Sequence, residues 1–160
     1  MNDGTTHTIQ PRIDFTKAAP EGLTAIRRLE AYVQRSGLEE SLLNLVRMRA
    51  SQINGCAYCL DMHSKDARAA GETEQRLYTL SAWRETPFFT DRERAALEWT
   101  EAITRISANP ISDDLYERTS RYFDEKELTD LTFAIVAING WNRLAIPFRA
   151  PVGSYQPAST

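Results

Sequence analysis

The stretch SQINGCAYCLDMHSKDARAAG, residues 51–71, contains both cysteines of this 160-residue chain and one of its two histidines. Cys56 and Cys59 are three residues apart, and His63 follows four residues later. On an α-helix, positions i, i+3 and i+7 lie within a narrow arc of one face. A helix that begins at the cysteines would therefore present both thiols and the imidazole on a single face.

The residues before the cysteines favour such a helix start, because Asn54 and Gly55 interrupt the preceding helical pattern. In a first turn, unpaired backbone N–H groups and the positive end of the helix dipole favour a thiolate. Residues three apart on a helix have Cβ atoms about 5–6 Å apart, whereas a disulfide requires roughly 3.5–4.5 Å. Modest distortion of a first turn closes this gap, so the pair suits a disulfide that forms and breaks.

The chemistry that this arrangement supports is peroxide reduction. A thiolate attacks the peroxide, becomes a sulfenic acid and is captured by the second thiol as a disulfide, which an external dithiol reduces. We assign the attacking role to Cys59, because His63 lies one turn beyond it and can accept its proton or hydrogen-bond its anion. Cys56 is nearer the helix start and is expected to be more exposed, which suits the resolving cysteine.

A structural zinc site is an alternative interpretation of the same residues. Zinc in such sites has four ligands, of which Cys56, Cys59 and His63 would supply three. Asp61, Asp66 or a water molecule would have to complete the set. A second C-x-x-C or H-x₃-H pattern is absent from the sequence, so zinc ranks below the redox interpretation.

Three further possibilities carry less weight. The cysteines can be simple core residues, since free cysteine is among the most buried residue types. A c-type haem is excluded because Leu60, rather than histidine, follows Cys59. A thioredoxin-like motif would require a βαβ context. The other histidine, His7, lies in a polar arm and is expected to face solvent.

The rest of the chain predicts helices throughout. Apolar residues recur at helical spacing, and the expected helices cover residues 23–33, 38–53, 56–70, 73–85, 90–107, 112–123 and 124–146. The run FAIVAI, residues 133–138, is β-compatible but continues a helical pattern, and we expect a central core helix or a subunit interface there. The sequence therefore predicts an all-α, single-domain bundle of about six to seven helices.

Several residues are expected to set the ends of these helices. Gly37 and Gly71 suit left-handed stops, and Pro147 is expected to stop the last helix. Capping boxes are expected at two helix starts, Thr90 with Glu93 and Asp124 with Glu127. An extended N-terminal arm over residues 1–20, a helical domain over 21–149 and a loosely held C-terminal tail over 150–160 complete the organisation.

Composition restricts the partners. The net charge is −3, and no basic stripe offers a phosphate-binding surface, so no nucleic-acid partner is expected. The N-terminus lacks a secretory signal pattern, and no apolar run reaches the length of a membrane span. We predict a cytoplasmic protein without a membrane partner. In the cytoplasm a close cysteine pair is more often catalytic or metal-binding than structural.

The burial of several large side chains can also be predicted. Arg47 and Arg49 are expected on a solvated face, and Trp83, Trp99 and Trp141 in a core or interface.

The motif SQINGCAYCLDMH, followed by a helix that ends in AAG, resembles the core of the alkylhydroperoxidase D / carboxymuconolactone decarboxylase family. The resemblance is strongest over residues 38–72 and extends more loosely to ERAALEWTEAIT and AINGWNRLAIPFR. It implies an all-helical fold, a homo-oligomer (trimer, hexamer or dimer) and a peroxidase cycle on a small hydroperoxide substrate, with an external dithiol reductant and no cofactor. In that family the second cysteine of the motif is peroxidatic and the first resolves it, which agrees with Cys59 and Cys56, and His63 matches the family's histidine.

Two positions depart from the family pattern. Asn44 stands where the proton relay often has a glutamate, and an amide cannot take up a proton. Glu40, one turn earlier on the same expected helix, is a candidate substitute. Tyr58 replaces a histidine found in some members, and a phenol is a poor base near neutral pH. We predict a peroxidase of reduced activity; the alternatives are a cofactor-independent lyase with His63 as acid or base, and a non-enzymatic redox-sensing module.

Overall fold

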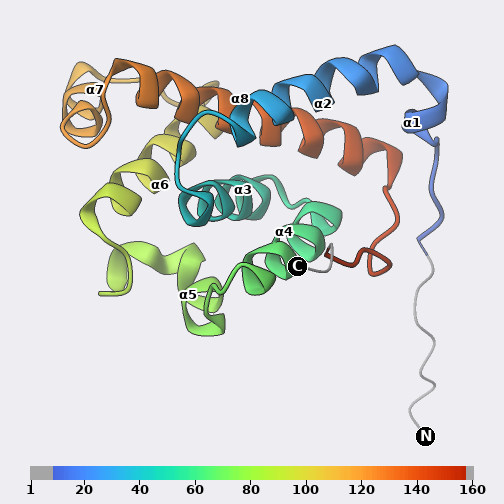
Figure 1. Ribbon diagram of the computed structural model, residues 1–160, viewed down its shortest axis with the longest axis horizontal. Helices are drawn as coiled ribbons and strands as arrows, with labels where there is room; N and C mark the ends of the chain where they lie inside the picture. Colours follow the sequence, from blue (N-terminus) through green and yellow to red (C-terminus); the bar gives the residue numbers. More distant parts are fainter. Residues whose placement is uncertain (1–8, 158–160) are drawn as a thin grey trace, which may run out of the picture.

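The computed structural model describes residues 9–157, which form eight α-helices, one 3₁₀-helix and, within that range, no β-strand (Figure 1). The predicted all-α fold class is confirmed. Residues 1–8, which include His7, and 158–160 lie outside the described residues. In chain order the elements are α1 (Phe15–Ala18), α2 (Pro20–Gln34), α3 (Glu40–Asn54), α4 (Ala57–Ala69), α5 (Glu74–Thr79), the 3₁₀-helix η1 (Leu80–Glu85), α6 (Asp91–Thr104), α7 (Asp113–Ser120) and α8 (Glu125–Phe148).

The central helix of the fold is α3, in which every residue from Leu42 to Ser51 is buried. It packs against α4, α6 and α8, and α2 lies alongside α8 (Figure 1). Gly140 permits the close approach of α2 and α8, because a Cβ atom there would lie 3.1 Å from Ile26 Cδ1. Because α3 contains polar residues, its sequence did not indicate that it is the most enclosed helix.

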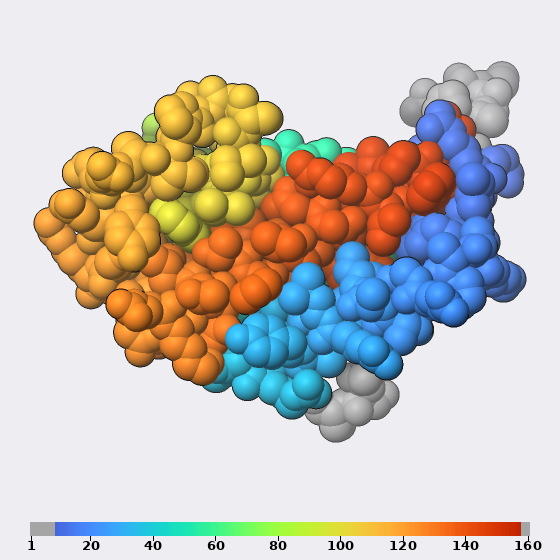
Figure 2. Space-filling view, turned by 90° about the horizontal axis from the view of Figure 1, so that it is seen from above, coloured from blue at the N-terminus to red at the C-terminus, as the bar shows by residue number. Residues whose placement is uncertain are grey.

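The run FAIVAI lies in α8, which is an outer helix with one buried face. Ala134, Ile135 and Ile138 are buried, whereas Phe133 and Val136 are 42% and 49% exposed. Figure 2 shows α8 crossing this face of the molecule beside α2. Only one side of the run therefore contributes to the core. None of the helices within residues 9–157 is long and apolar enough to cross a membrane.

The predicted helix ends agree well with the structure. Thr90 with Glu93 and Asp124 with Glu127 form capping boxes at the starts of α6 and α8. Gly37 and Gly71 have positive φ angles of 97° and 94°, as expected for left-handed stops. The last helix differs slightly, because α8 continues through Pro147 to Phe148, and its C-cap Arg149 has a φ of 56°.

The prediction of one continuous helix over residues 73–85 is wrong. The chain forms α5 and then η1, with non-helical backbone at Ala82. In a 3₁₀-helix the side chains at i and i+3 lie on the same side. This geometry directs both Leu80 and Trp83 into the core, where they are 0% and 4% exposed. Leu80 and Trp83 thus enter the core from the same side of η1.

Trp83 also contributes to a buried ion-pair network around Glu101. This carboxylate accepts hydrogen bonds from Arg49 Nε (2.8 Å), Trp83 Nε1 (2.9 Å) and Arg84 Nη1 (2.7 Å). Burial alone would raise the pKa of Glu101, but the hydrogen bonds from these three side chains outweigh it and hold the pKa below its ordinary value. The expectation that Arg49 lies on a solvated face is therefore wrong.

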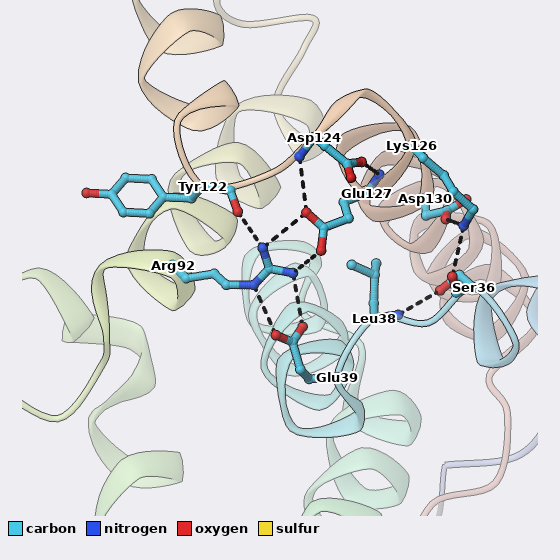
Figure 3. Close-up of polar contacts among 9 residues, drawn as sticks. All are labelled: Ser36, Leu38, Glu39, Arg92, Tyr122, Asp124, Lys126, Glu127 and Asp130. Carbon is cyan, nitrogen blue, oxygen red and sulfur yellow. Dashed lines mark hydrogen bonds and ion pairs between the residues drawn. The ribbon is translucent and has the colours of Figure 1, made fainter.

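A second charged cluster joins the ends of three helices (Figure 3). Arg92, in the first turn of α6, donates to Glu39 at 3.1 and 3.2 Å and to Glu127 at 2.8 Å. It also donates to the carbonyl of Tyr122, which precedes α8. Since Glu39 stands at the N-cap position of α3 and Glu127 lies in the first turn of α8, one guanidinium links α3, α6 and α8.

The described parts of both terminal segments pack against helices, which the sequence did not predict. The N-terminal arm contains α1, and its Arg12 N–H and Nη1 donate to the carbonyls of Phe148 and Pro147, each at 3.0 Å. After α8, the expected loosely held tail is instead bound to α4 over residues 150–157. Hydrogen bonds run from Tyr155 Oη to Asp66 (2.6 Å), from the Gly153 N–H to Asp61 (3.1 Å) and from Lys65 Nζ to the Tyr155 carbonyl (3.0 Å).

Candidate functional site

The cysteine pair lies at the junction between α3 and α4. Gly55 ends α3 in a left-handed conformation with a φ of 70°, and Cys56 is the N-cap of α4. Cys59 follows in the first turn, and its backbone N–H donates to Cys56 Sγ at 3.3 Å. The two residues form a disulfide, with their Cα atoms 5.3 Å apart. The sequence correctly placed the pair at a helix start, within reach of each other.

Both cysteines are buried, and each is 1% exposed. The expectation that Cys56 is the more exposed of the two is therefore wrong. The reason is tertiary: Ala50 from α3 and Ile138 and Ala145 from α8 pack around the pair. A position at a helix start determines exposure only when no other element covers that end.

A network of buried and half-buried amides links the junction to α8. Asn54 Nδ2, at the end of α3, donates to the side-chain oxygens of Asn139 (2.9 Å) and Asn142 (2.8 Å). Asn142 is 0% exposed and donates back to Ser51 Oγ at 3.1 Å. Sequence reasoning missed these residues. The available signal was the pair Asn139 and Asn142, two polar residues three apart in a mostly apolar stretch of α8.

A mainly apolar cavity of about 390 Å³ reaches the pair from one side, and of the two cysteines it is Cys59 that lines it. Its wall includes Leu23 of α2, Met62 of α4 and Trp141 of α8. The N-terminal segment 11–16 and residues 150–151 complete it. Sequence reasoning missed the contribution of these segments, because nothing in their composition shows where they fold back.

His63 lines a different pocket of about 510 Å³, which has more charged and polar side chains in its wall than the Cys59 cavity. Asn44 and Arg47 line it, together with Glu30, Glu40, Asp66 and Tyr155. Arg47 is only 5% exposed and forms an ion pair with Glu30 at 2.5 Å, so the expectation of a solvated face is wrong for this arginine too. Met62 and Trp141 line both cavities and therefore lie between them.

The His63 side chain is buried, at 8% exposure, and neither ring nitrogen has a hydrogen-bond partner among residues 9–157. Its Nδ1 lies 3.8 Å from a carboxylate oxygen of Asp66, beyond hydrogen-bond distance. Burial, with a further contribution from the charge of Arg47, lowers the pKa of His63 to about 3. The imidazole is therefore neutral near pH 7.

The structure thus brings Cys56 and Cys59 together and places His63 one turn further along the same helix, facing another pocket. The carboxylates considered as zinc ligands have other partners: Asp61 binds Lys65 and the Gly153 N–H, and Asp66 binds Tyr155. No group of three or more His, Cys, Asp or Glu side chains in the described part of the chain is arranged to hold a metal ion.

Comparison with known proteins identifies the family to which this fold and motif belong. The model of the carboxymuconolactone decarboxylase family matches residues 18–102, more than half of the chain. The chain belongs to this family. YdfG, a protein of uncharacterised function from Bacillus subtilis (strain 168), is 44% identical over 135 residues, which are 84% of this chain and 92% of YdfG. The likeness thus covers nearly the whole of both proteins.

Solved structures show the same architecture. A protein of unknown function from Agrobacterium tumefaciens, for which a role as an antioxidant defence protein AhpD has been suggested, has a TM-score of 0.85 and 45% identity, covering 94% of this chain and 100% of that one. The debrominase Bmp8 is 17% identical with a TM-score of 0.77, covering 87% of this chain and 74% of that one. At that identity the likeness shows the fold alone.

Within this family pattern, the two departing residues lie in different cavities. Asn44, at the relay position, is 4% exposed and lines the His63 pocket, where Glu40 is also found. Tyr58 lines the Cys59 cavity. Glu40 therefore shares a pocket with His63, but no hydrogen bond joins the two.

We expect the His63→Gln variant to lose part of the pH dependence of stability. The folded-state pKa of about 3 lies below the ordinary value of 6.5, so as pH falls through 6.5 the unfolded state binds a proton that the folded state does not. In the wild type, the free energy of unfolding should therefore decrease as pH decreases, with a slope approaching about 1.4 kcal/mol per pH unit, and His63→Gln should lack this slope. Urea unfolding of the oxidised protein between about pH 6.5 and pH 5 measures this slope.

The matched control is His7→Gln, which removes the other histidine. We expect it to keep the slope that His63→Gln loses. A slope that survives in His63→Gln, or disappears only in His7→Gln, would contradict the buried neutral state of His63.

Proposed function

We propose that this protein is a thiol-dependent peroxidase that reduces hydrogen peroxide or organic hydroperoxides. The observation that supports this most directly is the asymmetry of the pair: Cys59 lines a cavity, and Cys56 lies behind it as its disulfide partner. A substrate in the cavity would meet Cys59 first. The position of Cys59 in the first turn of α4 also favours its thiolate.

The cycle has three balanced steps. The Cys59 thiolate attacks one oxygen of the peroxide, the O–O bond breaks, and the alcohol or water product leaves with a proton while Cys59 becomes a sulfenic acid. The Cys56 sulfur then attacks the sulfenic sulfur, the disulfide forms and water leaves. An external dithiol reduces this disulfide by thiol exchange and is itself oxidised.

In this proposal His63 acts as a hydrogen-bonding group rather than as a store for the proton. A pKa of about 3 leaves the imidazole neutral. Neither ring nitrogen has a partner within residues 9–157, so in this proposal the ring turns from its own pocket toward the Cys59 anion once the pair is reduced and donates its one N–H there. With Asn44 and Tyr58 at the two other relay positions, proton transfer has fewer carriers. We therefore propose slow turnover.

Other properties stay predictions. We expect a cytoplasmic homo-oligomer, for which the exposed Phe133 and Val136 of α8 offer an apolar contact surface. We expect neither nucleic acid nor a membrane as a partner. The reductant is expected to be a small dithiol or a dithiol protein that can reach the pair through the Cys59 cavity.

A cofactor-independent lyase is a second candidate function. The observation that favours it is the pocket of His63, Asn44 and Arg47, which is separate from the cavity of Cys59. There His63 would act as acid or base and the cysteines would be incidental. Its lowered pKa makes it a weak base, which is why we rank this function second.

Thiol titration with and without cumene hydroperoxide tests the peroxidase proposal. We expect the reduced protein to lose both thiols rapidly, in step with consumption of one peroxide per chain, and to form an intramolecular disulfide. Unreactive thiols would contradict the proposal and favour the lyase. Slow oxidation accompanied by a changed oligomeric state would instead favour a redox-sensing module. The Cys56→Ser/Cys59→Ser double variant controls for oxidation elsewhere in the chain.

A further inference from the structure

The cavity at Cys59 is lined by one cationic side chain, which has no partner among residues 9–157. Asp14 and Arg27 are its two charged lining residues. The Asp14 carboxylate accepts hydrogen bonds from Thr16 Oγ1 (2.5 Å) and the Thr16 N–H (3.1 Å) and lies 3.3 Å from Lys17 Nζ. Arg27 is exposed and makes no ion pair or hydrogen bond with any residue in the range 9–157. Its guanidinium therefore leaves an unbalanced positive charge at the rim.

The interior of the cavity differs sharply from this rim. Most of the cavity's other lining residues are apolar, among them Phe15, Leu23, Met62 and Trp141, and its volume of about 390 Å³ is within the usual range for small-molecule sites, roughly 300–1,000 Å³. Hydrogen peroxide is small and polar and would gain little from such a surface. An apolar body would gain about 25 cal/mol for each Å² removed from water. The cavity is thus suited to an organic hydroperoxide with an extended apolar part.

We propose that the preferred substrate is an amphiphilic hydroperoxide that carries a carboxylate, and that Arg27 binds this carboxylate while the peroxide group reaches Cys59. Arg27 is then a specificity-determining residue. A guanidinium forms two parallel hydrogen bonds with a carboxylate, which fixes the end of the substrate as well as attracting it. A flexible acyl chain can span the distance between the two ends without a rigid match in length. The inference rests on the peroxidase function proposed above.

Steady-state kinetics with linoleic acid hydroperoxide and its methyl ester test this inference, with dithiothreitol as the reductant. We expect the wild-type KM to be about five- to ten-fold lower for the acid, equivalent to about 1–1.4 kcal/mol, with similar kcat values. Arg27→Gln should raise the KM of the acid to that of the ester and leave the ester unchanged. Arg28→Gln removes an adjacent exposed arginine that does not line the cavity, and it should keep the preference.

Equal KM values for acid and ester in the wild type would overturn the inference, as would an equal effect of Arg27→Gln and Arg28→Gln. If no hydroperoxide is consumed at all, the peroxidase function fails rather than the site. Calorimetric binding of hydroxylinoleic acid, the unreactive alcohol product, to the oxidised protein then tests the carboxylate site without any turnover. Binding that Arg27→Gln weakens supports the carboxylate site, and absence of binding excludes it.

Discussion

Replacing Cys59 with serine is expected to reduce peroxide consumption by roughly a thousand-fold or more, to the rate of a chain without the motif. The serine hydroxyl cannot be oxidised to an analogue of sulfenic acid, and Cys59 is the cysteine that lines the cavity. Cys56 lies in the same buried cluster but does not line the cavity. A remaining thiol at Cys56 should therefore react slowly with any hydroperoxide.

The complementary variant, Cys56→Ser, should behave differently. Its Cys59 should consume one equivalent of peroxide and stop at the sulfenic acid, because no resolving thiol follows. Mass spectrometry after trapping with dimedone would detect this species at Cys59. If Cys59→Ser consumed one equivalent and Cys56→Ser consumed none, the assignment of the two cysteines would be reversed. Since each variant replaces one buried sulfur with oxygen at the same junction, they control for each other's structural effects.

The second large effect concerns stability: Glu101→Gln should lower the free energy of unfolding by about 2–4 kcal/mol. The substitution keeps the shape of the side chain but leaves Arg49, which is 9% exposed, without its charged partner. Trp83 Nε1 and Arg84 Nη1 also lose a charged acceptor. Urea unfolding of the oxidised protein at neutral pH measures the change.

Glu98→Gln is the matched control, because it makes the same change one turn earlier on α6. Glu98 pairs with Arg118 at 3.2 Å, and the two side chains are 36% and 43% exposed. An exposed pair of this kind contributes less than about 1 kcal/mol. Equal losses in the two variants would show that the buried network has no special role.

The acid side of the stability curve gives a further check on Glu101. Because the network lowers the pKa of Glu101 below its ordinary value of 4.5, its contribution is fully present above that value. The contribution is lost as pH falls through the lowered pKa. Glu101→Gln should therefore flatten the loss of stability as pH falls below 4.5.

Local signals explain why so much of the fold could be predicted. The capping boxes at Thr90 and Asp124 and the left-handed glycines depend on hydrogen bonds and backbone angles within a few residues. The spacing of Cys56 and Cys59 likewise follows from helix geometry, once Gly55 ends α3. Such features are readable from sequence because every group involved is adjacent in the chain.

Burial was much less predictable, because it depends on segments far apart in sequence. Arg47 and Arg49 look like surface charges by composition, but Glu30 and Glu101, from other helices, turn them into buried ion pairs. Cys56 looks exposed at a helix start until α8 covers it. The helix α3 contains polar residues and yet lies at the centre, since neighbours on every side satisfy or enclose them.

The sequence by itself determined an all-helical chain with two thiols at the start of one helix and an imidazole one turn beyond. Only the tertiary structure decided that Cys59 and His63 serve different cavities, and that Arg27 stands at the rim of one of them. The physical reason is that the walls of a cavity come from segments far apart in the sequence. Its walls come from both terminal segments and from α2, α4 and α8, and no local pattern records which surfaces they bring together.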